Sequence, residues 1–141
     1  MKKALILVFS LFLLTSLNCA TTEKLDLTGT WLLTEEVSGC GSGVTRTQTV
    51  ELTQKGDTVT SVNIDRNWTM IGKIYNDIIS FVRVQRTSYG YSGEPGTVDI
   101  HASKVKISED AETLTSEVNW SWTGEQGYKC NGISYLTYKR K

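Results

Sequence analysis

The residues of this chain with the clearest capacity for covalent chemistry are its three cysteines, at positions 19, 40 and 130. Cys19 follows a leader that begins with two lysines and continues as an almost unbroken apolar run over 4–17. This run is shorter than the roughly 20 residues that a membrane-spanning helix needs, and its charged start is typical of an export signal. Export leads to an oxidising compartment, where disulfides persist. If Cys19 is modified, Cys40 and Cys130 remain as a pair, and we expect them to form a disulfide.

The leader and its cysteine resemble a bacterial lipoprotein signal peptide. The resemblance implies a signal peptide over 1–18, a diacylated or triacylated Cys19 with acyl chains such as palmitate, and a tether over 19–27. Because no aspartate directly follows the cysteine, it also implies a lipid-anchored protein of the cell envelope, at the outer membrane. Ordinary secretory cleavage near Ala20, without a lipid, is the alternative.

The charge pattern excludes one class of partner. Fifteen basic and fifteen acidic residues balance in the whole chain, and loss of the two leader lysines makes the mature chain weakly acidic. Nucleic-acid binding needs a clustered positive surface, and only residues 139–141 cluster, which we interpret as a solvated chain end. The single histidine, His101, and the absence of a Cys-x-x-Cys motif predict no metal site and no cofactor.

Catalytic chemistry has little support in the sequence. Asp99 could orient His101 two residues later on the same strand face, but no Ser or Cys lies in an elbow motif to act as the nucleophile. The acidic pairs at 35–36 and 110–112 are expected to be surface and turn carboxylates. We therefore expect a protein that is not an enzyme.

Short alternating segments separated by turn residues recur after the leader, at the spacing of about 8–12 residues that is typical of an all-β sandwich or barrel. The predicted strands lie at 29–37, 44–54, 57–65, 68–75, 78–86, 97–107, 113–122 and 132–139. The seventh alternates most clearly, with Val118, Trp120 and Trp122 on one face, which indicates one packed and one wet face. In the fifth, apolar residues populate both faces, which predicts a cover over its outer side.

The segment Leu27-Thr28-Gly29-Thr30-Trp31 resembles the opening of lipocalin-like (calycin-type) barrels, in which a Gly-x-Trp begins the first strand. The segments 51–60 and 108–115 are similar to hairpins of small bacterial lipoprotein barrels with this opening. The resemblance implies one antiparallel up-and-down barrel of about eight strands over 28–141. It also implies that Trp31 closes one end of the barrel, beneath a ligand cavity.

In such a barrel the first and last strands are antiparallel neighbours. Cys40 falls just past the first predicted strand and Cys130 just before the last. Their disulfide would therefore close the seam of the barrel. An open sandwich could also place the two cysteines close together but does not require it.

Two interpretations of the many aromatic residues stay open, because an eight-stranded barrel is just wide enough to fill itself with side chains or to hold one small ligand. In the pocket interpretation, a small hydrophobic ligand would contact Trp31, Arg46, Trp68, Trp120 and Trp122, below a rim formed by 38–43. The Tyr-, Ser- and Gly-rich loop at 87–96 supports another function, a loop-mediated protein-binding module or an inhibitor of an envelope enzyme. A plain surface loop is the simpler interpretation of this segment.

Overall fold

The computed structural model describes residues 25–89 and 93–141, and all regular secondary structure in these ranges is β-strand. The strands are β1 (Gly29–Gly39), β2 (Ser42–Lys55), β3 (Thr58–Asn63), β4 (Trp68–Tyr75), β5 (Ile78–Phe81), β6 (Val84–Tyr89), β7 (Pro95–Ile100), β8 (Ser103–Ile107), β9 (Thr113–Gly124) and β10 (Lys129–Arg140). The predicted all-β class is confirmed. The predicted signal peptide, Cys19 and most of the tether lie outside the described residues. The described ranges contain no helix long and apolar enough to cross a membrane.

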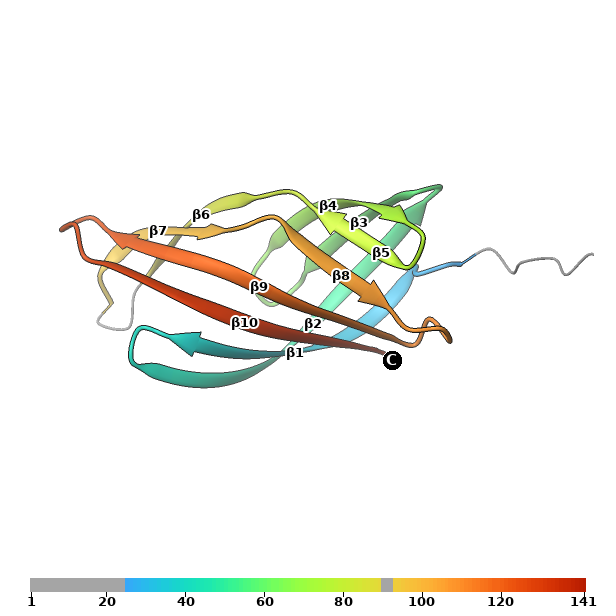
Figure 1. Ribbon diagram of the computed structural model, residues 1–141, viewed down its shortest axis with the longest axis horizontal. Helices are drawn as coiled ribbons and strands as arrows, with labels where there is room; N and C mark the ends of the chain where they lie inside the picture. Colours follow the sequence, from blue (N-terminus) through green and yellow to red (C-terminus); the bar gives the residue numbers. More distant parts are fainter. Residues whose placement is uncertain (1–24, 90–92) are drawn as a thin grey trace, which may run out of the picture.

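Eight strands close into an antiparallel barrel, in the order β1, β2, β3, β4, β5, β8, β9, β10 (Figure 1). Closure is completed by the last strand, because β10 pairs with both β9 and β1. The remaining strands, β6 and β7, pair with each other. β7 also pairs with the C-terminal part of β9, from Trp120 to Gly124, and so continues the wall there. The up-and-down barrel expected from the sequence is therefore present, with its fifth and sixth strands each divided in two.

The two divisions lie opposite each other. Residues 82–83 separate β5 from β6, residues 101–102 separate β8 from β7, and the pairs Phe81↔Ser103 and Val84↔Ile100 flank both gaps. Each gap reverses which residues point inward, as a bulge does. Ile100 and Ser103, of opposite parity, both line the interior.

The cover predicted over the outer side of the fifth strand is wrong. Val82, in the gap, is 68% exposed. Apolar residues populate both parities there because the inward parity changes along the chain, not because both faces are buried.

A side slit separates β4 from β6. β4 pairs with β5 only over Gly72–Tyr75, and the described residues supply no second ladder for 68–71 beyond that with β3. Arg86 of β6 spans the slit, since its Nη2 donates a hydrogen bond to the Thr69 carbonyl (2.8 Å) and its guanidinium lies 4.7 Å from the centre of the Trp68 ring. One side chain thus replaces a row of backbone hydrogen bonds.

A hydrophobic core fills the end of the barrel where β1 begins. Its fully buried members are Leu27, Trp31, Val50, Val59, Ile79, Leu114 and Val105. The Trp31 indole donates a hydrogen bond to the Leu27 carbonyl (3.0 Å), which satisfies its polar atom inside the core.

Arg140 of β10 covers this closed end. Its guanidinium lies 4.7 Å from the centre of the Trp31 ring and donates hydrogen bonds to the carbonyls of Asp26 (2.7 Å) and Thr28 (3.1 Å). Its Nε also lies 3.3 Å from a Glu112 carboxylate oxygen. The interpretation of 139–141 as a merely solvated chain end is therefore wrong for Arg140, which joins the start of the domain to its last strand.

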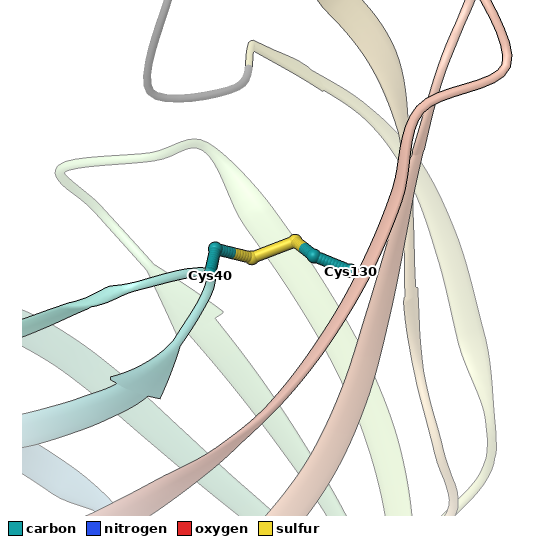
Figure 2. The surroundings of a disulfide bond; sticks show 2 residues. All are labelled: Cys40 and Cys130. Atoms are coloured by element: carbon teal, nitrogen blue, oxygen red, sulfur yellow. A yellow bond between two sulfur atoms is a disulfide. The ribbon is translucent and has the colours of Figure 1, made fainter.

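The predicted disulfide between Cys40 and Cys130 is confirmed. Figure 2 shows it joining the β1–β2 turn to the start of β10, with the two Cα atoms 5.5 Å apart and 90 residues between the cysteines in sequence. It lies at the end of the β1–β10 ladder, where Gly39 pairs with Gly132. The bridge therefore fastens the seam at the end opposite Trp31.

Candidate functional site

The half of the barrel that carries the disulfide encloses a cavity of about 920 Å³. It opens at the end that carries the disulfide, because exposed residues such as Cys40, Arg46 and Tyr128 belong to its lining. The apolar part of the lining comprises Leu33, Val37, Val44, Val50, Trp68, Met70, Phe81, Val98, Ile100, Val105, Val118, Trp120, Trp122 and Leu136. The β1–β2 turn and the β9–β10 turn are both at this end of the molecule (Figure 1).

Four of the five residues expected to line a pocket do line this cavity. They are Arg46, Trp68, Trp120 and Trp122. Trp31 does not, because the inward side chains of β1 enter the lining only from Leu33 onward and Trp31 lies one step deeper, in the core. Of the rim expected at 38–43, Gly39 and Cys40 belong to the lining.

Glycines on neighbouring strands explain why two tryptophans leave space inside so narrow a barrel. Trp120 lies against Gly132, its partner in the β9–β10 ladder, so closely that a Cβ there would overlap the indole. Trp122 lies against Gly96 of β7, where a Cβ would be 2.7 Å from the ring atom Cζ2. The rings therefore lie along the wall instead of projecting across it. Tyr128 continues this aromatic wall to the mouth, with its ring centre 6.1 Å from that of Trp122.

A polar cluster forms another part of the lining, and we call it the Glu35 cluster. Its members are Glu35, Gln48, Asn63, Arg66 and Ser134. The carboxylate of Glu35 accepts hydrogen bonds from Gln48 Nε2 and Ser134 Oγ, both at 3.1 Å, and lies 3.6 Å from Arg66 Nη2. Gln48 in turn accepts a hydrogen bond from Asn63.

The Glu35 cluster corrects one expectation from the sequence. Glu35 was expected to be a surface acid, but its side chain is only 16% exposed and lines the cavity. The signal was present in the sequence, because Glu35 shares the inward parity of Trp31, Leu33 and Val37. Its neighbour Glu36 is exposed, as expected.

Burial changes the proton affinity of groups near this cluster. Desolvation lowers the pKa of Arg66, and the carboxylate of Glu35 partly offsets that shift. The pKa of Tyr138, which lines the cavity, is raised well above its ordinary value, first by complete burial and second by Glu35. Arginine keeps its proton even so, and Tyr138 remains a neutral phenol at physiological pH.

Four ionisable carboxylates and guanidiniums line the cavity, and their formal charges cancel. Glu35 is paired with Arg66. Arg46 and Glu94 lie in the lining without an ion pair to another described residue, and Glu94 accepts a hydrogen bond from the Gln126 backbone amide (3.0 Å). The cavity is therefore polar on one wall without a net charge.

The other candidate chemistry lies outside the cavity. Asp99 binds Arg83 and Gln85, and the hydrogen bond from Arg83 is the main reason that the pKa of Asp99 falls to about 2. His101, in the gap between β7 and β8, is exposed. Among residues 25–89 and 93–141, no three His, Cys, Asp or Glu side chains lie close enough together to hold a metal ion.

The loop expected to recognise a protein is shorter than its sequence suggested. β6 extends to Tyr89 and β7 starts at Pro95, while residues 90–92 lie outside the described part of the chain. Ser88 and Glu94, on either side of them, line the cavity.

Comparison with known proteins adds little to this geometry. No protein-family model matches the chain, and no curated protein matches it. Among solved structures, the monomer form of the M. tuberculosis PknI sensor domain matches with a TM-score of 0.44 and 10% sequence identity, over 85% of this chain and 90% of that one. A similarity of this size carries no argument about function.

Proposed function

We propose that this protein is a non-catalytic binding protein whose barrel holds one small apolar or amphipathic molecule. The cavity of about 920 Å³ is the observation that carries the proposal. Ligand pockets typically measure about 300–1,000 Å³ and combine mostly apolar walls with a few well-placed polar groups. Trp120 and Trp122, which we call the tryptophan wall, supply apolar surface, and the Glu35 cluster supplies polar groups.

The energetics of burial support useful affinity. Removing apolar ligand surface from water yields about 25 cal/mol per Å². A ligand that buries about 400 Å² would gain about 10 kcal/mol before the costs of association. After association costs of about 4 kcal/mol, about −6 kcal/mol remains, which corresponds to a dissociation constant of tens of micromolar.

A probe titration tests the proposal. N-phenyl-1-naphthylamine is uncharged and becomes fluorescent in apolar surroundings, and we expect it to bind saturably with one site per chain. Val118→Trp places a large side chain in the cavity, whereas Asn119→Trp places the same side chain on the outer face of β9. We expect Val118→Trp to weaken probe binding at least about tenfold and Asn119→Trp to leave it unchanged. Non-saturable binding, or equal effects of two folded variants, would contradict the proposal.

We further propose, from Cys19 and its leader, that the domain is anchored at the outer membrane by lipid, with the membrane as its first partner. Mass spectrometry of the mature N-terminus decides between a diacylated or triacylated Cys19 and an unmodified end near Ala20. The alternative function, a loop-mediated protein-binding module, rests on the 87–96 loop and stays a prediction from the sequence.

A further inference from the structure

The tryptophan wall carries hydrogen-bond donors that the protein itself does not use. The indole Nε1 atoms of Trp120 and Trp122 are buried, and neither has an acceptor among the residues that the structure describes. Trp122 is only 7% exposed. A buried donor without an acceptor costs about 1–3 kcal/mol, and buried tryptophan normally finds a partner.

Trp31 provides the contrast within the same barrel. It is fully buried, and its Nε1 donates to the Leu27 carbonyl at 3.0 Å. The unpaired indoles are therefore not a general feature of this barrel's tryptophans. They belong to the two tryptophans of β9, which are separated by one residue and both line the cavity.

No described acceptor is hydrogen-bonded to either indole nitrogen. Glu94 and Trp122 both lie against Gly124. The Oε1 atom of Glu94 accepts a hydrogen bond from the Gln126 backbone amide (3.0 Å). Both carboxylate oxygens of Glu35 accept hydrogen bonds within the Glu35 cluster. The described residues therefore leave both indole donors available to a molecule in the cavity.

The charge of that molecule follows from the lining. The acidic and basic groups around the cavity cancel, and Glu35 already has its counter-charge in Arg66. Arg46, the lining guanidinium without an ion pair, is exposed on β2, and the charged group beside Trp122 is the acid Glu94. A buried anionic group at the indoles would therefore have no adjacent counter-charge, and an unpaired buried charge is expensive. A neutral oxygen acceptor meets no such cost.

We propose that the ligand carries an uncharged oxygen acceptor, a carbonyl or hydroxyl group on an apolar body, and that the indole N–H groups of Trp120 and Trp122 bind this oxygen. The inference rests on the proposed function and specifies its ligand class. The apolar body lies against Val98, Ile100 and Val118, which neighbour these tryptophans in the wall. Recognition then depends on two donors from a single strand.

Two nearly isosteric probes test the inference, 2-acetylnaphthalene with a carbonyl oxygen and 2-ethylnaphthalene without one. Affinities are measured by displacement of N-phenyl-1-naphthylamine, and the ratio of the two affinities is compared between wild type and Trp→Phe variants. Trp120→Phe and Trp122→Phe remove the donors and keep aromatic surface. We expect each to reduce the preference for the ketone by about 3- to 10-fold, the worth of one neutral hydrogen bond. Trp68→Phe, in the lining but without such an unpaired donor, should leave the ratio unchanged.

NMR of the wild-type protein supplies a second measurement that needs no variant to fold. The indole ¹H–¹⁵N signals of Trp120 and Trp122 should move downfield with 2-acetylnaphthalene and not with 2-ethylnaphthalene, while that of Trp31 stays in place. Equal affinity ratios in all folded variants, with no downfield shift, would overturn the inference and leave the proposed function standing. Displacement by neither probe would overturn both. Tighter binding of 2-naphthoate than of the ketone, lost in Trp120→Phe or Trp122→Phe, would overturn the neutral ligand.

Discussion

At the scale of single residues, Arg140 shows how one side chain can complete a barrel end. It covers the Trp31 ring and binds two carbonyls of the segment before β1. A cation–π contact contributes about 0.5–2 kcal/mol. A hydrogen bond from a charged donor contributes about 1.5–3 kcal/mol. Arg140, close to the end of the last strand, thus packs on the tryptophan of the Gly29-x-Trp31 motif at the start of the first strand.

We expect Arg140→Ala to lower the free energy of unfolding by about 1–3 kcal/mol, because Trp31 loses its cover and the carbonyls of Asp26 and Thr28 lose their donors. Urea unfolding followed by tryptophan fluorescence measures this. Lys139→Ala is the matched control, since Lys139 is exposed and its loss should change stability by less than about 0.5 kcal/mol. Equal midpoints for the two variants would show that Arg140 only solvates the chain end.

Single residues also mark the limit of what the sequence could reveal. Gly29 and Trp31 form a local motif, and the four other pocket candidates share strand parities that point inward, so most could be found by counting. Arg140 could not be assigned in this way, and the inward parity of Glu35 was outweighed by its charge. Their partners lie on strands far away in sequence, and charge alone favours a surface position.

At the scale of strands, glycines facing tryptophans determine the shape of the cavity. Gly132 and Gly96 provide flat backbone on which the rings of Trp120 and Trp122 lie. Aromatic side chains often cover a glycine on a neighbouring strand in this way. Alternation predicted the inward tryptophans, but not whether they fill the barrel or line it, since that depends on cross-strand pairs.

An added Cβ at Gly132 would overlap both the Trp120 ring and the Ser38 carbonyl oxygen. We therefore expect Gly132→Ala to displace the Trp120 ring into the cavity and to strain the β1–β10 pairing, weakening N-phenyl-1-naphthylamine binding at least about fivefold and costing about 1–3 kcal/mol of stability. Gly43→Ala is the control, because the nearest atom to its added Cβ would be the Val37 carbonyl oxygen at 3.9 Å. Fluorescence titration and urea unfolding of both variants give the comparison. Unchanged binding in Gly132→Ala would mean that Trp120 does not need the glycine.

The strand count carries a similar lesson. All eight predicted segments exist, because turn residues and period-two alternation are local signals. The gaps at 82–83 and 101–102 were missed. A parity change inside a strand imitates a strand buried on both faces, and only the pairing with neighbouring strands distinguishes them.

At the scale of the whole molecule, the disulfide and the core fasten opposite ends of the same seam. The core holds the end with Trp31, and the bridge between Cys40 and Cys130 holds the mouth. The mouth has few buried apolar contacts because the cavity takes their place. The bridge should therefore contribute strongly where packing cannot.

Reduction of the disulfide should lower the free energy of unfolding by up to about 4 kcal/mol, because the bridge restricts a loop of about 90 residues in the unfolded chain. Urea unfolding with and without reductant measures the difference, and a Cys40→Ser/Cys130→Ser variant separates it from other effects of the reductant. Coinciding midpoints for the bridged and reduced protein would contradict this expectation.

Because no backbone ladder between described residues joins β4 to β6, the barrel can widen at the side slit more easily than elsewhere. A barrel in which all neighbouring strands are hydrogen-bonded has a fixed circumference, because widening it breaks several backbone hydrogen bonds together. Here the circumference between β4 and β6 is completed by Arg86, whose bond to Thr69 is a single side-chain contact. Elastic strain from a bulky guest would concentrate at this weakest join and leave the ladders intact. The lumen is thus stiff around most of its perimeter and compliant along one line.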